Sequence, residues 1–364
     1  MYLILGIILI LAITIIIIKQ AKFGKTPKEK RLERIMKSPN YKNGAFQNQS
    51  NTPQFTEGSN IMKVMKEFMF GNNKHKSPID NIPSKKINLL NLNPNEDLLV
   101  WFGHSSYFMQ IDGKSILVDP VFSGHASPFA FSIKSFKGAD VYSAADFPAL
   151  DYLFITHDHW DHLDYPTIIE LKPKIKHIVT GLGTGEHFEH WNFDVNKITE
   201  LDWYETTELA PGFKVSATPS RHFSGRGYKR NKAIWVSFVL ETPSMKFFLG
   251  GDSGYDKHFV EIGKKYGPFD LAILENGQYN QNWKYIHMTP AEGIQAAYDL
   301  NTTKHLPVHS AKFALANHNW DTPLKDIYAL SKKTNIELIT PIIGEAVVLK
   351  NSDQTFKPWW EEIK

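Results

Sequence analysis

The stretch His157-Asp158-His159-Trp160-Asp161-His162 places three imidazoles and two carboxylates within six residues, directly after the strand-like run Tyr152-Leu153-Phe154-Ile155. Imidazole nitrogens and carboxylate oxygens are the ligands that suit zinc. The first two histidines are two residues apart, so they lie on the same side of an extended segment. The last two ligands come after the bend and can serve a second ion. The stretch therefore predicts a metal site, because a polar surface loop rarely contains ligands at this density.

Six further segments in chain order carry a resemblance to a known family. They are Arg31-Leu32-Glu33-Arg34-Ile35 followed by Ser38-Pro39-Asn40-Tyr41, Trp101-Phe102-Gly103-His104-Ser105, Leu117-Val118-Asp119-Pro120, Gly251-Asp252-Ser253-Gly254-Tyr255, Ile286-His287-Met288-Thr289-Pro290 and Pro307-Val308-His309-Ser310. Together with the hexapeptide they resemble the metallo-β-lactamase superfamily from about Arg31 to the C-terminus. They look most like the branch of the N-acylphosphatidylethanolamine-hydrolysing phospholipase D and its bacterial relatives. Leu163-Asp164, where many superfamily members have glycine, favours this branch over lactamases and glyoxalases.

The resemblance implies an α+β fold, a four-layer αβ/βα sandwich, with a binuclear metal centre. The first ion would be held by His157, His159 and His222, and the second by Asp161, His162 and His309. Asp252 would bridge the two ions. The resemblance also implies catalytic roles for Asp161 and Asp252, and substrate contact or proton delivery by His287. Two zinc ions are expected, although manganese or iron could occupy such ligands.

The sequence around the later ligands supports this set independently. His222 follows the strand-like run 213–217, Asp252 follows the apolar strand 247–249 and is flanked on one side by glycines, and His309 follows the run 305–308. Side chains at strand ends gather where loops surround an active site. His104 and Asp119 are candidates for outer-shell partners, since a buried aspartate can fix the tautomer of a ligand imidazole. Weaker candidates for orienting an anionic substrate are Arg221, Arg226, Gln278 and Tyr279. Surface or hydrogen-bonded histidines are expected at six other positions: His177, His187, His190, His258, His305 and His318.

The composition excludes several classes of function. With 364 residues and 42% hydrophobic residues the chain can form a full core. The net charge of +3 is too mild to indicate nucleic acid as a partner. The absence of cysteine excludes disulfides, thiolate ligands and lipid attachment at a thiol.

The first eighteen residues differ in kind from the rest. They are apolar apart from Tyr2 and Thr14, and a series of lysines follows from Lys19 onward. This length is about the minimum for crossing a hydrocarbon core of ~30 Å. Because positive residues tend to stay on the cytoplasmic side, we expect a transmembrane helix with the catalytic domain in the cytoplasm, in a single-pass protein of a bacterial inner membrane. A buried N-terminal helix is the competing interpretation, which the apolar residues on all faces disfavour.

Three regions are predicted along the chain: a transmembrane anchor at 1–18, a linker and N-terminal extension at 19–90, and a hydrolase domain at 91–364. Apolar residues at helical spacing between 61 and 69 predict an amphipathic helix, either packed on the core or touching lipid. Further on, strands are predicted at 98–102, 107–111, 115–118, 233–241, 246–249, 271–274, 305–308 and 336–343. Thr289-Pro290-Ala291-Glu292 has the signature of a capped helix start.

These observations favour a membrane-anchored, metal-dependent phosphodiesterase of phospholipase D type. It would cleave N-acylphosphatidylethanolamine to N-acylethanolamine and phosphatidic acid through a metal-bound hydroxide. Its partners would be phospholipid or another phosphodiester, and the membrane; the oligomeric state is left open. The alternative is a lactonase or other ester hydrolase of the same fold, acting on a small metabolite. A wide apolar groove at the metals would favour lipid, and a closed polar pocket would favour the metabolite. A third interpretation, a metal-stabilised envelope or binding protein without catalysis, has no need for so complete a ligand set.

Overall fold

Two seven-stranded sheets form the body of the protein. The computed structural model describes residues 2–71, 73–351 and 353–364. In the first sheet the strand order is β16-β3-β4-β5-β6-β7-β8. Its strands are β3 (Leu98–Trp101), β4 (Tyr107–Ile111), β5 (Lys114–Val118), β6 (Leu150–Ile155), β7 (Ile175–Gly181), β8 (Ile198–Leu201) and β16 (Ala346–Val348). The second sheet has the order β15-β14-β13-β12-β11-β10-β9. Its strands are β9 (Thr206–Ala210), β10 (Phe213–Pro219), β11 (Val236–Glu241), β12 (Lys246–Leu249), β13 (Leu271–Glu275), β14 (Lys304–Val308) and β15 (Glu337–Leu338).

The two sheets share one pattern of strand directions. In the first, β16, β3, β4 and β5 are antiparallel, and β5 to β8 are parallel. In the second, β9 to β12 are antiparallel, and β12 to β15 are parallel. The predicted turn between β4 and β5 is confirmed: Asp112 and Gly113 have φ of 46° and 73°. Positive φ at both central residues is what a type I′ hairpin requires, and glycine adopts it at no steric cost.

The core explains why the sheets face each other. Along β6, Tyr152 and Phe154 belong to the cluster between the sheets, whereas Leu153 and Ile155 belong to a cluster under the helices. Successive side chains of a strand point to opposite faces, so a strand that is apolar at every position is buried on both sides. Strand β11 does the same in the second sheet, with Phe238 between the sheets and Val239 under the helices.

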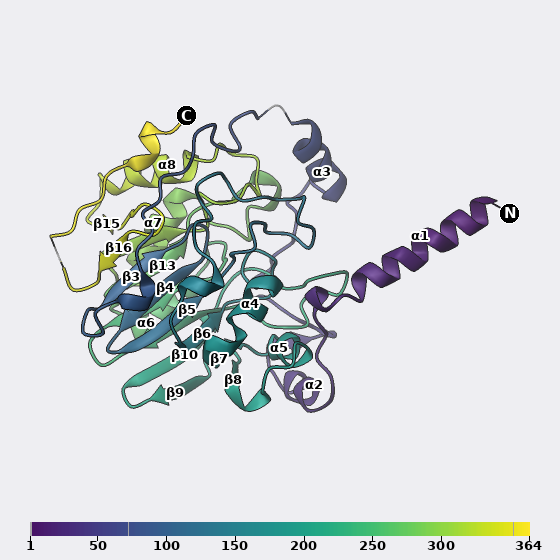
Figure 1. The fold of residues 1–364 in the computed structure, drawn as a ribbon, viewed down its shortest axis with the longest axis horizontal. Coiled ribbons are helices and arrows are strands. Elements are labelled where there is room, and N and C mark those ends of the chain that lie inside the picture. Colours follow the sequence, from purple (N-terminus) through teal and green to yellow (C-terminus); the bar gives the residue numbers. More distant parts are fainter. Residues whose placement is uncertain (1, 72, 352) are drawn as a thin grey trace.

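Helices cover the outer faces of both sheets, where their apolar side chains pack with those of the strands; Figure 1 shows the arrangement of the elements. The helices of the structure are α1 (Tyr2–Ile18), α2 (Glu29–Met36), α3 (Ile61–Phe70), α4 (Tyr165–Leu171), α5 (Gly185–His190), α6 (His258–Tyr266), α7 (Pro290–Asp299) and α8 (Thr322–Ser331). The predicted start of α7 is confirmed, with a capping box between Thr289 and Glu292. The αβ/βα sandwich predicted from the family resemblance is therefore present.

The predicted transmembrane helix is wrong. Helix α1 has 17 residues, and at ~1.5 Å per residue it reaches ~25 Å, short of a hydrocarbon core of ~30 Å. Within the part of the chain that the structure describes, no helix is both long enough and apolar enough to span a membrane. The predicted single-pass localisation in an inner membrane is wrong for the same reason, and a membrane partner has no support.

The N-terminal extension is tied to the body by charged side chains. It contributes a two-stranded sheet of β1 (Tyr41–Lys42) and β2 (Ala45–Phe46). The guanidinium of Arg31, whose side chain is 9% exposed, contacts the carboxylates of Glu186, Glu189 and Glu200 at 2.7 to 2.8 Å. Helix α3 is different, because none of its residues is buried. It therefore does not pack into the core as an ordinary amphipathic helix would.

Candidate metal centre

The predicted ligands lie at one edge of the sandwich, where strands of both sheets end. The loop after β6 carries the hexapeptide, so it comes from the first sheet. His222 follows β10, Asp252 follows β12 and His309 follows β14, so these three come from the second sheet. Because the strands around each position run to this edge, seven side chains from four segments meet there, although up to 152 residues separate them.

The first group consists of the side chains of His157, His159, His222 and Asp252, which can offer one ligand atom each to a single ion. Nδ1 of His159 is 2.9 Å from Nε2 of His157 and 3.2 Å from Nε2 of His222. Oδ2 of Asp252 is 3.8 Å from the first of these Nε2 atoms and 3.6 Å from the second. These separations bracket the edge, about 3.3 Å, of a tetrahedron around an ion with ligands at ~2.0–2.1 Å.

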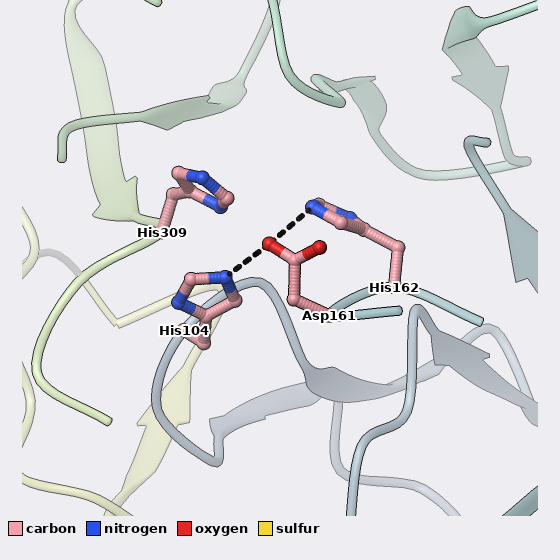
Figure 2. Close-up of side chains that lie close together, drawn as sticks. All are labelled: His104, Asp161, His162 and His309. Atoms are coloured by element: carbon pink, nitrogen blue, oxygen red, sulfur yellow. Dashed lines mark hydrogen bonds and ion pairs between the residues drawn. The ribbon is translucent and has the colours of Figure 1, made fainter. Parts of the chain in front are cut away.

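The second group contains His104, Asp161, His162 and His309. Figure 2 shows the carboxylate of Asp161 between the rings of His104 and His162, with His309 beside them. Oδ2 of Asp161 accepts a hydrogen bond from Nε2 of His104 at 2.9 Å and lies 3.6 Å from Nε2 of His162. The predicted second ligand set is thus together in space, and His104 adds an imidazole that contacts its carboxylate.

Asp252 lies between the two groups. Its Oδ1 is 3.1 Å from Nε2 of His162 and 3.2 Å from Nδ1 of His309, whereas its Oδ2 faces the first group. Each oxygen therefore addresses a different set of imidazoles, which is the arrangement that a bridging carboxylate needs.

Hydrogen bonds to neighbouring groups fix the imidazole tautomers. Asp119 accepts from Nδ1 of His162 at 2.8 Å, and it also accepts from Thr156 through the backbone N–H and the hydroxyl. Because that hydroxyl donates to Asp119, it accepts from Nδ1 of His157 at 3.0 Å. Nδ1 of His222 donates to the carbonyl of Ile286 at 2.9 Å. In the neutral form of all three rings Nε2 is left with its lone pair toward the centre, as a metal ligand requires.

Burial and mutual charge set the protonation of the group. Burial holds the pKa of His157 and of His222 well below the usual value, so both are neutral. Burial alone would raise the pKa of Asp252, but His162 and His309 outweigh it and place that pKa well below its usual range. Burial likewise opposes charge on His162, yet the facing carboxylates of Asp252 and Asp161 raise its pKa well above the usual value.

The burial and the donor atoms of these residues fit a divalent metal ion. Nε2 of His309 is buried without a hydrogen-bond partner, and Nε2 of His162 and Oδ1 of Asp252 are buried and face each other at 3.1 Å without a hydrogen bond. A buried polar atom without a partner costs about 1–3 kcal/mol, so such atoms in one cluster need an explanation. Imidazole and carboxylate donors in this number are the ligand chemistry of a zinc-like ion.

His287 lies beside the second group, and its partner was not foreseen from the sequence. Its ring is 5.2 Å from that of His309, nearly parallel at 19°. Its Nδ1 donates to Glu275 at 2.6 Å, and Glu275 is 1% exposed at the end of β13. Burial raises the pKa of Glu275 to about 7; burial lowers that of His287, but Glu275 outweighs it and raises the value to about 8. Glu275 is the last residue of β13. The predicted ligands also lie at strand ends, so this position was the sequence feature that could have indicated a role for Glu275.

The weaker candidates have structural partners. Arg226 donates to the carbonyls of Asp158 and Leu163, so it holds the hexapeptide loop from behind. Arg221 donates to the carbonyls of Asn51 and Tyr255. Nη2 of Arg226 is buried without a hydrogen-bond partner, but neither guanidinium lines the cavity at the candidate ligands. Gln278 lines the cavity at the centre, and Tyr279 lines a neighbouring one.

An apolar cavity of about 270 Å³ opens onto the candidate ligands. Besides site residues, its lining is mostly apolar: Phe55, Ile61, Val64, Phe223, Trp283, Ile286 and Leu315. Two of these side chains belong to α3, and further along that helix Met65 and Phe68 are exposed, at 51% and 41%. The apolar wall of the cavity therefore continues outward along an exposed helix.

Comparison with known proteins gives consistent results. A family model described as a β-lactamase superfamily domain matches residues 114–310. An uncharacterised protein of Mycobacterium tuberculosis is 33% identical over 327 residues, which are 89% of this chain and 87% of that protein. The N-acyl-phosphatidylethanolamine-hydrolyzing phospholipase D 1 of Caenorhabditis elegans is 30% identical over 222 residues, covering 57% of this chain and 62% of that protein. A metallo hydrolase structure from Ignicoccus hospitalis covers 70% of this chain and 98% of its own, with TM-score 0.53 and 19% identity, a likeness of fold alone.

Proposed function

The chain belongs to the metallo-β-lactamase superfamily and is a metal-dependent hydrolase, and we propose that it cleaves the phosphodiester of N-acylphosphatidylethanolamine. The products would be N-acylethanolamine and phosphatidic acid. The observation that carries this proposal is the apolar cavity at the candidate ligands, since its walls suit an acyl chain beside the reacting phosphodiester. The partial likeness to a phospholipase D of Caenorhabditis elegans supports the same substrate.

In this proposal the seven predicted side chains hold two divalent ions, with His157, His159 and His222 at the first and Asp161, His162 and His309 at the second. Zinc is the proposed metal, because imidazole and carboxylate donors suit it best. Two such ions lower the pKa of water and stabilise both the attacking and the leaving oxygen of a phosphodiester.

The chain's own groups supply the rest of the chemistry. The carboxylate of Asp252, ionised between the two groups, orients the attacking water by accepting a hydrogen bond from it. Asp161 is held by the N–H of His104 at 2.9 Å, so its carboxylate stays in one orientation. His287 contacts the substrate next to His309. The apolar residues around the cavity exclude bulk water from the phosphodiester.

The test measures metal content and lipid hydrolysis together on the full-length protein. We expect about two metal ions per chain and release of N-acylethanolamine from N-acylphosphatidylethanolamine in mixed micelles, abolished by a chelator. Bound metal without lipid cleavage would refute the proposed substrate and redirect the search to lactones and other esters. Protein without bound metal would contradict the ligand assignment itself.

Variants of α3 test the role of the apolar wall. Val64→Gln places a polar group in the cavity lining, so we expect a higher KM for the lipid and little change for a small soluble diester such as bis(p-nitrophenyl) phosphate. Met62→Gln is the matched control, since Met62 lies on the same helix, is 78% exposed and does not line the cavity. Equal effects of both variants, or no effect of Val64→Gln, would count against lipid binding at this wall.

A further inference from the structure

Glu275 is a buried carboxylate with two donors from adjacent residues. Its Oε2 accepts from Nδ1 of His287 at 2.6 Å, and its Oε1 accepts from the backbone N–H of Met288 at 2.5 Å. The carboxylate itself sits at the end of β13, a central strand of the second sheet, so its own position is fixed by the sheet. It therefore holds the segment 287–288 at two points from a rigid element.

The imidazole of His287 lines two cavities. On one side it lines the apolar cavity next to His309 and His222, whose ring centroids are 5.2 and 5.1 Å away. On the other side it borders a second cavity of about 290 Å³, lined mostly by polar residues that include Lys284 and His318. The χ2 torsion of histidine is intrinsically broad, so the hydrogen bond to Glu275 is the polar contact that fixes the plane of this ring.

We infer that Glu275 is a positioning residue that acts through His287. The carboxylate keeps a hydrogen on Nδ1 whether the ring is neutral or charged, and it sets the plane of the ring. Nε2 is then the nitrogen left for the substrate. This inference rests on the proposed function only in taking His287 as a group that contacts the substrate.

The segment held by Glu275 is also linked to the first group of candidate ligands. Ile286 directly precedes the clamped segment, and its carbonyl accepts Nδ1–H of His222 at 2.9 Å. A large displacement of the segment would therefore disturb the tautomer of His222 as well as the ring of His287, so the test needs a variant such as glutamine that keeps the shape of the side chain and leaves the Ile286 carbonyl in place. If Glu275 served only to satisfy two buried donors, its replacement would change the stability of the protein without a specific effect on the function of His287.

The variant Glu275→Gln separates the two roles. Glutamine keeps the shape but offers one acceptor oxygen and one NH₂ group, so one of the two donors meets another donor. We expect kcat to fall at least about tenfold for any diester that the enzyme cleaves, with bound metal and the urea unfolding midpoint little changed. The matched control is Glu292→Gln, which alters the capping box of α7 rather than this contact.

A double-mutant cycle makes the coupling measurable. If Glu275 acts through His287, Glu275→Gln adds no further loss in a His287→Ala background. Additive losses, or an unchanged kcat in the single variant, would overturn the inference. Cleavage of bis(p-nitrophenyl) phosphate without cleavage of lipid would refute the proposed substrate and leave this cycle interpretable.

A spectroscopic readout does not depend on activity. In two-bond ¹H–¹⁵N spectra of histidine-labelled metal-free protein, with His287→Ala providing the assignment, we expect His287 to carry its hydrogen on Nδ1. That pattern should change in Glu275→Gln. A wild-type spectrum with unprotonated Nδ1 would overturn the inference even if the glutamine variant failed to fold.

Discussion

Replacement of Asp119 by asparagine probes how the metal centre is held from behind. Asp119 is 1% exposed and accepts three hydrogen bonds, two of them at Oδ2, from His162 Nδ1 at 2.8 Å and the Thr156 hydroxyl at 2.6 Å. The third, from the Thr156 backbone N–H, goes to Oδ1 at 2.9 Å. Asparagine has one acceptor oxygen, so it cannot accept the hydrogen bonds made to both Oδ1 and Oδ2 of Asp119.

The consequence depends on which way the amide turns. If its oxygen replaces Oδ2, its NH₂ group meets the backbone N–H of Thr156. If its oxygen replaces Oδ1, its NH₂ group faces Nδ1 of His162, and the imidazole must move its hydrogen to Nε2. That nitrogen lies 3.1 Å from Asp252 and would then be unable to bind a metal. Loss of such an outer partner typically costs about 10–100-fold in metal affinity, or ~1.4–2.7 kcal/mol.

The assay is competition between metal-free protein and a chromophoric chelator. Asp202→Asn is the control, because Asp202 is 6% exposed, accepts from Asn40 and the Trp203 backbone, and contacts none of the site histidines. We expect weaker metal binding for Asp119→Asn and none of this loss for the control. A change below about threefold in Asp119→Asn would refute the reasoning.

Three further predictions concern turnover and stability. Asp252→Asn should abolish turnover with the unfolding midpoint near that of the native protein; full activity would rule out the bridging role. Arg31→Ala leaves Glu186 buried without its partner and should lower the free energy of unfolding in urea by ~3–5 kcal/mol. The control Arg34→Ala should lower it by at most about 1 kcal/mol, because that ion pair is exposed. Equal losses in the two variants would contradict this reasoning. Burial lowers the pKa of His258 to about 3. Below about pH 6.5 this histidine is therefore protonated in the unfolded chain but stays neutral in the folded chain, so the free energy of unfolding falls from pH 6.5 toward pH 3. Unfolding at pH 7 and pH 4 should show a smaller loss for His258→Gln; an identical loss would remove His258 as a contributor.

Local patterns in the sequence were sufficient for much of the fold. The hairpin of β4 and β5 follows from two short strand-like runs joined by Asp112-Gly113, and α7 follows from its capping residues. The region 336–343 was expected to be one long strand, but β15 covers only Glu337–Leu338. Apolar content alone could not place that limit, because the neighbouring residues are buried in the core without pairing to a strand.

The site was predictable where its residues cluster in the sequence. The hexapeptide identifies itself, but the association of His222, Asp252 and His309 with it came from family resemblance, since no local rule relates positions so far apart. Glu275 was missed because its role depends on a contact across 12 residues with His287. The error over α1 was one of length: the apolar run was taken as about the minimum for a membrane span, and its helix contains 17 residues.

The candidate ligands are divided between the two sheets, and this division has a thermodynamic consequence. The hexapeptide belongs to the first sheet, while His222, Asp252 and His309 belong to the second. An ion bound by both sets is also a crosslink between the layers, which only the folded sandwich can provide. Its binding would add RT ln(1 + [M]/Kd) to the free energy of unfolding, about 2.7 kcal/mol at a hundredfold excess over Kd. The melting temperature would then report the free metal concentration, and scarcity of metal would loosen the sandwich itself.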